Sequence, residues 1–309
     1  MSKVTALLQD LAMFYGRNEG RASLILKALG GLILFFVLTG ISADALGGGQ
    51  RVLLTVVPAA LTAVCSPAAV LLLAAAVALF CVFEVSVEAA ALLLFLLFLF
   101  FVFYVRFFPK ESLVVPVMVV LAVFRLPMLA VLFAGVYVGL RAIIPVGVAV
   151  FLTSQWPLMQ ELMALAPRAD FTPMGALDTA LQMYGLITSQ FDFVSWGSVW
   201  AVYVVAILAG WAVRSLMIDW EREKALAVSA IVTTVGLCLA RTLAGSVVPY
   251  SQAIVGTAVS ALLCWAFFQI DCVLDYPKAE RVRFQDEKYV YYVKAVPKIH
   301  RSYRQEEGQ

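Results

Sequence analysis

The sequence predicts an all-α polytopic membrane bundle of about 8–10 membrane segments, some short or re-entrant, with a small C-terminal β-hairpin tail. Hydrophobic residues make up 63% of the 309 residues and charged residues 14%, whereas soluble domains have about 45–50% apolar and about 25% charged residues. The stretch 85–105 carries a single charge, Glu88. At about 1.5 Å per residue it is roughly 30 Å long, the thickness of a hydrocarbon core. A multi-pass membrane protein is therefore expected.

The distribution of lysine and arginine predicts the topology. Cytoplasmic loops are enriched in both residues, and most of the 22 in this chain fall before the first apolar run, just after residue 105, between residues 214 and 224, and in the C-terminal tail. We therefore divide the chain into a cytoplasmic amphipathic N-terminal segment (1–27), a transmembrane bundle (28–275) and a cytoplasmic tail (276–309). Both termini are expected in the cytoplasm.

The first half of the bundle contains two apolar pieces that are short for a membrane span. The first span, 28–46, leads outward, and the span 85–105 returns inward to a basic segment. The region 52–83 between them must then cross the membrane an even number of times. It is divided at Ser66 and Pro67 into pieces of about 14 to 16 residues, below the usual 17 to 25. Two short spans and a re-entrant hairpin both fit, and we favour two short spans.

A second interrupted region, 112–154, precedes an acidic loop, 155–193, which we place outside and expect to form two amphipathic helices. The region 112–154 must then cross the membrane once or three times. Three ordinary spans, 194–213, 225–246 and 253–274, complete the bundle. Three tryptophans near the ends of the acidic loop suit the aromatic belt at a membrane surface: Trp156, Trp196 and Trp200.

Four prolines are candidate broken-helix residues: Pro58, Pro67, Pro116 and Pro127. The second pair loosely repeats the first, as in transporters built from repeats that contain broken helices. Chance is the simpler explanation, because proline is common in membrane helices. In a transporter, these prolines should meet around a polar cavity. In a scaffold, the same place should be packed solid.

Charged residues near or inside apolar runs are candidate intramembrane sites, because a charge in hydrocarbon costs at least about 2.5–3.5 kcal/mol and usually faces water or a partner. Glu84 and Glu88 are four residues apart and would share one helical face. Arg241 has a comparable depth, so we predict that it pairs with them as an ion or proton site; a surface turn with a snorkelling arginine is the simpler alternative. Arg125 and Arg141 either line a polar cavity, bind lipid phosphates or mark helix ends at the interface.

The sequence predicts neither an enzyme nor a metal site. Its one histidine, His300, lies in the polar tail, so a catalytic triad or a histidine-rich metal site cannot form in the membrane. All five cysteines lie in apolar runs without the spacing of a metal or redox motif. No nucleotide-binding loop is recognisable, and neither a cofactor nor a nucleic-acid partner is expected.

The tail is expected to form a β-hairpin. Residues 282–285 and 289–296 are rich in β-branched and aromatic residues and flank a polar turn. An isolated two-stranded hairpin is marginal in water, so it should dock on a protein partner, on a second copy of the chain or on the bundle's own loops. The candidate docking residues are Phe284, Tyr289, Tyr291, Tyr292 and Val293.

The string YYVKAVPK at 291–298, together with the whole layout, resembles an uncharacterised group of bacterial multi-pass membrane proteins. The resemblance covers most of the chain. It implies a bacterial plasma-membrane location and brings with it no activity, substrate or site residue.

Two functions are compatible with these features, and the sequence favours the first of them. One is a permease-like membrane subunit of a transport or export assembly that docks a cytoplasmic partner through its tail, and the interrupted short helices favour it. The other is a non-transporting membrane scaffold for envelope or division machinery, favoured by the shortage of polar residues along any continuous path. In both, the lipid bilayer surrounds the bundle.

Overall fold

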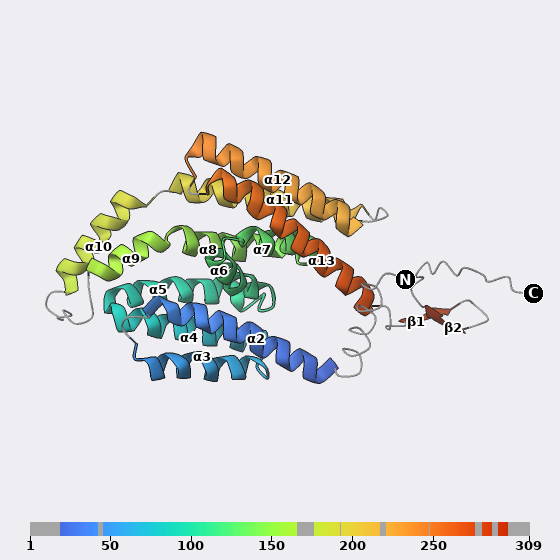
Figure 1. Cartoon of the computed structure of the whole chain (residues 1–309), viewed down its shortest axis with the longest axis horizontal. Coiled ribbons are helices and arrows are strands. Elements are labelled where there is room, and N and C mark those ends of the chain that lie inside the picture. The colour runs from blue at the N-terminus through green and yellow to red at the C-terminus, as the bar shows by residue number, and fades with distance from the viewer. Residues whose placement is uncertain are drawn as a thin grey trace, which may run out of the picture. The chain divides into compact units, whose positions relative to one another are not determined.

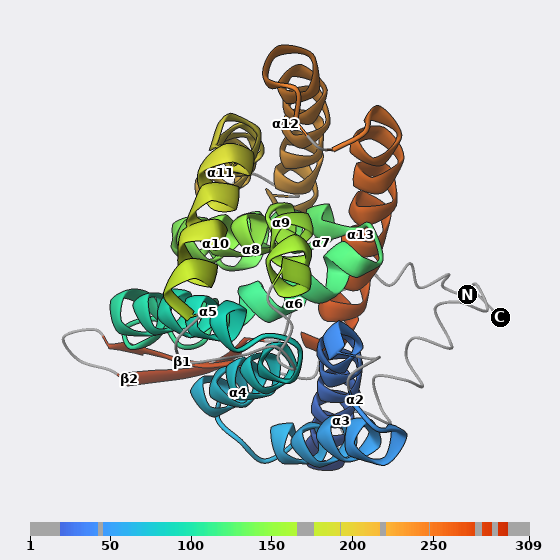
Figure 2. The ribbon, with the colours of Figure 1, turned by 90° about the vertical axis from the view of Figure 1, so that its left-hand side faces the viewer.

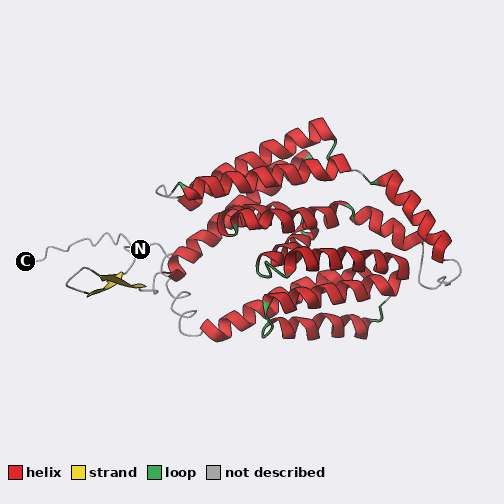
Figure 3. Cartoon of the chain, turned by 180° about the vertical axis from the view of Figure 1, so that it is seen from behind, coloured by secondary structure: helices red, strands yellow, loops and turns green. Residues whose placement is uncertain are grey.

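Helices make up almost all of the structure. The computed structural model describes residues 19–42, 46–165, 176–191, 193–216, 221–246, 248–275, 280–285 and 290–295. Within these ranges, strands occur only in the hairpin near the C-terminus (Figure 3). The chain divides into two units, Arg21–Trp265 and a second one made of Met1–Gly20 with Ala266–Gln309. Most of the predicted N-terminal segment, residues 1–18, lies outside the described residues.

The first four helices lie side by side (Figure 1): α2 (Glu19–Thr39), α3 (Gly48–Thr62), α4 (Pro67–Val85) and α5 (Val87–Phe100). Thr62 Oγ1 donates to the carbonyl oxygen of Lys27 at 3.1 Å, and the hydroxyl groups of Thr39 and Thr55 are 3.1 Å apart. The end of α3 therefore meets the start of α2, and the two helices are antiparallel. Helix α2 begins at Glu19, before the predicted span 28–46.

Two serine caps divide this region. Ser66 Oγ accepts the N–H of Ala69 at 3.4 Å, and Pro67 is the first residue of α4, so the predicted break is confirmed. Ser86 has an extended backbone (φ −151°, ψ 129°) and accepts the N–H of Ala89 at 3.3 Å. Because of this cap, the predicted span 85–105 starts at Val87. It continues beyond α5 into a π-helical segment, Phe101–Val105.

Three short helices follow: α6 (Val114–Val123), α7 (Pro127–Tyr137) and α8 (Ile143–Ser154). They contain 10, 11 and 12 residues, so each is about 15–18 Å long, roughly half of a hydrocarbon core. Helix α8 is joined to α9 (Trp156–Leu165) at a bend of 49°, and α10 (Ala176–Gln190) follows. The loop 155–193 thus contains two helices as predicted, and Gln190 Nε2 donates to Glu161 Oε2 at 2.6 Å between them.

The three long helices predicted for the last part of the bundle are present: α11 (Phe193–Ser215), α12 (Glu221–Ala244) and α13 (Thr257–Asp275), the last preceded by a π-helical turn, Gln252–Gly256. Helices α11 and α12 approach closely because small residues line their contact. A Cβ at Gly236 would lie 2.6 Å from Val202 Cγ1. Ser229 Oγ donates to the carbonyl oxygen of Ala206 at 3.0 Å.

Six helical stretches of the described chain are long and apolar enough to cross a membrane: Gly20–Ser42, Pro67–Val85, Val87–Val105, Phe193–Ser215, Glu221–Ala244 and Gln252–Gln269. The bent pair α8–α9 would be a seventh. The protein is therefore a multi-pass membrane protein. The prediction of 8–10 segments also counted short pieces, to which α3, α6 and α7 correspond.

The short helices α6–α8 lie between α4–α5 and α11–α12 (Figures 1 and 2). Helix α7 packs against α11 and α12, and α8 packs against α6 and α11. Their contact is the main hydrophobic core of the unit Arg21–Trp265. The buried residues of this core come mostly from α6, α7, α8 and α11: Val115, Met118, Met128, Ala130, Val131, Ala134, Ala142, Val146, Ala149, Val150, Val199, Tyr203, Ala206, Ile207, Leu237 and Ala253.

In the second unit, β1 (Glu280–Gln285) and β2 (Val290–Ala295) pair in antiparallel register. Phe284 is opposite Tyr291 and Val282 is opposite Val293, so these four positions belong to one face of the hairpin. Tyr292 is opposite Arg283 and belongs to the other face. The register therefore separates Tyr292 from Phe284, Tyr291 and Val293, and Tyr289 lies outside the described residues.

Candidate functional site

The candidate site is the interrupted segment α6–α8. A Cβ at Gly135 would lie 3.5 Å from Ile207 Cα, and a Cβ at Gly139 would lie 3.0 Å from Trp211 Cδ1, so α7 runs parallel to α11. Further on, the carbonyl oxygen of Ile143 accepts a hydrogen bond from Trp200 and that of Gly147 accepts one from Trp196, so α8 runs antiparallel to α11. The chain reverses between these helices, and Gly139 at the reversal has φ +71°, which glycine adopts without strain.

The break between α6 and α7 is closed by a helix-ending motif. The N–H of Leu126 bonds the carbonyl oxygen of Leu121 at 2.8 Å, and the N–H of Arg125 bonds that of Ala122 at 2.9 Å, the pattern of a Schellman motif. Arg125 occupies its left-handed position with φ 60°, where glycine is usual. The arginine backbone is therefore strained by about 1–2 kcal/mol.

Three carbonyl groups that these breaks leave without helical partners are bonded by side chains from other parts of the bundle. The carbonyl oxygen of Arg125 accepts from Gln252 Nε2 at 3.2 Å. The carbonyl oxygen of Val136, in the last turn of α7, accepts from Arg214 Nη1. That of Arg141 accepts from the hydroxyl group of Tyr104.

Pro145 explains why the carbonyl of Arg141 needs this partner. In a helix this carbonyl would bond the N–H four residues later, and proline has none. A buried backbone carbonyl group that is left unsatisfied costs about 1–3 kcal/mol. The side chains of Gln252, Arg214 and Tyr104 therefore close the breaks, and we refer to these three hydrogen bonds as the carbonyl clamps.

Two tryptophans of α11 donate hydrogen bonds to carbonyl groups of α8. Trp200 Nε1 lies 3.2 Å from the carbonyl oxygen of Ile143, and Trp196 Nε1 lies 3.4 Å from that of Gly147. The two indole rings stack, with centroids 5.6 Å apart and an interplanar angle of 8°. Their N–H groups therefore attach α8 to α11, a contact that the expected place in an interfacial belt does not include.

The interior of the segment is densely packed. Val131, Leu132 and Ala134 of α7 have no exposed surface, nor has Ile207 of α11. Side chains packed in this way leave no room for a hydrated path between α7 and α11.

The four predicted broken-helix prolines lie on helices of two different hydrophobic clusters. Pro58 is buried inside α3 and Pro67 begins α4, and both helices contribute to a cluster with α2. Pro116 is in the first turn of α6 and Pro127 begins α7, in the core described above. Pro67 and Pro127 do start helices after a break, as expected of broken-helix residues.

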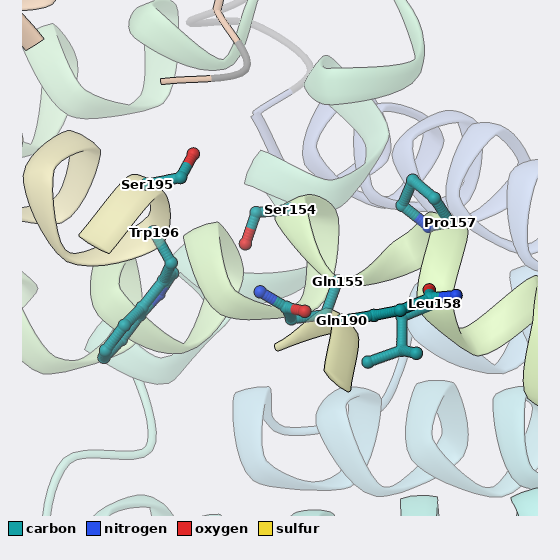
Figure 4. A pocket seen from close by; sticks show the side chains of 7 residues that line it. All are labelled: Ser154, Gln155, Pro157, Leu158, Gln190, Ser195 and Trp196. Carbon is teal, nitrogen blue, oxygen red and sulfur yellow. The ribbon is translucent and has the colours of Figure 1, made fainter. Parts of the chain in front are cut away.

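A small polar hollow of about 150 Å³ lies where α8, α9, α10 and α11 meet (Figure 4). Its walls contain two amides, two hydroxyl groups and the Trp196 ring: Ser154, Gln155, Pro157, Leu158, Gln190, Ser195 and Trp196. None of the four prolines belongs to it. A second, larger groove is entirely hydrophobic and suits contact with lipid: Leu79, Phe80, Phe83, Val87, Ala90, Ala91 and Leu94.

The acidic pair does not share a helical face, so that prediction is wrong. Glu84 lies in the last turn of α4 and Glu88 in the first turn of α5, because the Ser86 cap separates the helices. Glu88 Oε2 is buried and accepts no hydrogen bond from the described part of the chain. Its position in the first turn is favourable for a negative charge, whereas its burial is not.

The predicted pairing of Arg241 with these glutamates is also not observed. Arg241 Nη1 donates to the carbonyl oxygen of Ser246, beyond the end of α12, and α12 packs against α7 and α11. Arg241 therefore closes its own helix end. Arg125 and Arg141 both lie at helix breaks and are exposed.

Sequence reasoning missed Tyr104, Arg214 and Gln252, which form the carbonyl clamps. The only signal was Pro145, whose missing N–H implies an unpaired carbonyl at Arg141, but the sequence does not show which donor reaches it.

Within the described ranges, no group of three or more His, Cys, Asp or Glu side chains is placed to hold a metal ion. Comparison of the chain with protein-family models, with curated proteins and with solved structures found no match.

Proposed function

We propose that the chain is a non-transporting membrane scaffold of the bacterial plasma membrane, which holds a fixed bundle in the bilayer and recruits a protein partner through its tail. The observation that carries this proposal is the set of carbonyl clamps. In transporters with broken helices, unwound carbonyl groups coordinate the transported or coupling ion. In this bundle, the corresponding groups of Arg125, Val136 and Arg141 already accept protein hydrogen bonds.

Contacts at one end of the unit Arg21–Trp265 support a cytoplasmic assignment for that end. Arg214 bonds Val136, the guanidinium of Arg222 lies 5.7 Å from the Tyr137 ring, and Arg141 pairs with Glu111. Three arginines thus gather around the last turn of α7 and the turn after it. The negative end of the α7 dipole stabilises positive charge at this place. By the positive-inside rule this end faces the cytoplasm, and we propose that both termini do so too.

A permease-like subunit of a transport or export assembly is the second candidate. The three half-length helices and the chain reversal at Gly139 favour it, because interrupted helices are typical of transporters. The bacterial group that the YYVKAVPK string resembles is compatible with either function.

Thiol labelling in intact membranes separates the two candidates. Single cysteines at Val131 and Ala134, in a chain whose native cysteines are replaced by alanine, probe the contact between α7 and α11. If the protein is a scaffold, neither cysteine reacts with a water-soluble maleimide. A cysteine in place of the exposed Leu140, at a break, is the matched control and should react. Labelling at Val131 and Ala134 from either side would support the permease and contradict the scaffold.

The tail proposal has its own test. Phe284, Tyr291 and Val293 share one face of the hairpin register, and we propose that a cytoplasmic protein binds this face. Crosslinking in cells followed by mass determination should show a complex that F284S/V293S abolishes and Y292S keeps. If the complex consists of two copies of this chain, the tail mediates self-association and does not bind a different protein. Equal effects of both variants would contradict the face-specific docking.

A further inference from the structure

Cationic side chains from two different segments gather at one membrane surface. The span Val87–Val105 is about 28 Å long at 1.5 Å per residue, so the turn that follows it lies at the level of the lipid headgroups. Arg106 and Lys110 are exposed in this turn. Arg141 reaches the same level from the turn between α7 and α8, since its Nη1 atom lies 3.3 Å from Glu111 Oε1.

The side chain of Arg141 is held in position, yet most of its donors are available. Its guanidinium carbon lies 5.7 Å from the centroid of the Phe108 ring, and its carbonyl group is fixed by Tyr104. The side chain is 66% exposed, whereas that of Glu111 is 18% exposed. A guanidinium has five N–H donors, so the single bond to Glu111 leaves others for an external acceptor.

Aromatic side chains flank these cations. Phe103 is 74% exposed and Phe107 is 66% exposed, and both belong to the end of the same span and its turn. In a bilayer such rings contact acyl chains while the cations beside them reach the headgroups. The turn 106–111 and Arg141 together carry three cationic side chains and one carboxylate, so their net charge is positive.

We propose that Arg106, Lys110 and Arg141 bind the phosphate group of an anionic phospholipid, with Phe103 and Phe107 against its acyl chains. Arginine matches phosphate geometry, and cation clusters next to a span attract anionic lipids. Arg125 provides the contrast, because it is also exposed at a helix break but its carbonyl oxygen neighbours the uncharged Gln252 and Gly256.

Lipid titration of the full-length protein in mild detergent tests this inference. Binding is followed as the rise of the thermal unfolding midpoint with added dioleoylphosphatidylglycerol, dioleoylphosphatidylcholine or inorganic phosphate. We expect phosphatidylglycerol to raise the midpoint more than phosphatidylcholine, and inorganic phosphate to have no effect. Loss of one cation in R141Q should weaken the apparent affinity for phosphatidylglycerol about fivefold, and R125Q should leave it unchanged.

A double variant keeps the test decisive if R141Q does not fold. R106Q/K110Q removes two exposed charges without touching a carbonyl clamp and should weaken binding about 25-fold. Equal responses of the wild type to both lipids would overturn the proposal, as would equal losses in R125Q and R141Q. If inorganic phosphate alone stabilised the protein, the site would bind a soluble phosphate compound, and the proposal of a lipid ligand would be overturned.

Discussion

The hydroxyl group of Tyr104 donates a hydrogen bond to the carbonyl oxygen of Arg141, the group that Pro145 leaves without a helical partner. This bond joins the end of one membrane span to the turn between two half-length helices. It replaces a backbone bond by a side-chain bond from a distant part of the chain, so the carbonyl group at this break keeps a hydrogen-bond partner.

Removal of this hydroxyl group should destabilise the bundle. Tyr104→Phe keeps the ring contacts with Phe100 and Phe108 but leaves the carbonyl group of Arg141 unpaired, at a cost of about 1–2 kcal/mol. The measurement is the free energy of unfolding in mixed micelles. Tyr250→Phe, at an exposed position, is the control and should have no effect. An unchanged stability of Tyr104→Phe would show that this clamp is dispensable.

Two glycine substitutions in helices should have opposite effects. A Cβ at Gly147 would lie 2.6 Å from Trp200 Nε1 and 3.0 Å from Cε2 of the same rigid ring, so Gly147→Ala should cost about 1–3 kcal/mol by overpacking. Gly30 of α2 has nothing within 4 Å of such a Cβ, and Gly30→Ala should gain about 0.5–1 kcal/mol through helix propensity. Thermal unfolding in one detergent compares the two. A Gly147→Ala variant as stable as the wild type, or more stable, would contradict the close contact of α8 with α11.

The strained backbone of Arg125 predicts an unusual substitution pattern. Arg125→Gly should stabilise the protein by up to about 1 kcal/mol, because glycine adopts φ 60° without a Cβ clash. Arg125→Val should destabilise it, since a β-branched residue is disfavoured there. Chemical denaturation of both variants checks the order. If valine were better tolerated than glycine, the left-handed conformation would be absent in solution.

The buried oxygen of Glu88 predicts that its charge is not needed for folding. Glu88 Oε2 has no hydrogen-bond partner in the described part of the chain, so Glu88→Gln should leave stability equal or raise it by about 1 kcal/mol. Glu111→Gln is the contrasting variant: it removes the partner of Arg141 and should lower stability by up to about 1 kcal/mol. A strongly destabilised Glu88→Gln would point to a bound cation or donor at this carboxylate.

The sequence predicts those helices that are determined by residues within or next to them. The long apolar stretches and their polar ends correspond to α2, α4, α5 and α11–α13, and Pro67 after Ser66 predicts the start of α4. The Ser86 cap was equally visible, but the apolar residues around it concealed a break between two helices. For this reason the spacing of four residues predicts one face for Glu84 and Glu88, although they belong to different helices.

The site depended on contacts between distant segments and could not be predicted in the same way. Pro145 implies an unpaired carbonyl group, but its donor, Tyr104, lies on another helix and has no sequence signature. The direction of α7 and α8 along α11 is decided by the packing of Gly139 and Gly147 against Trp211 and Trp200. Apolar composition is the same for either direction, so the reversal is absent from the sequence pattern.

Amide hydrogen exchange of the protein in lipid nanodiscs tests the clamped segment most directly. If the clamps hold the breaks closed, the amides of residues 125, 126 and 138, which donate to backbone carbonyl oxygens, should exchange as slowly as those in the middle of α11. Fast exchange at these residues, with α11 still protected, would mean that water enters the breaks and would contradict a static, non-transporting core.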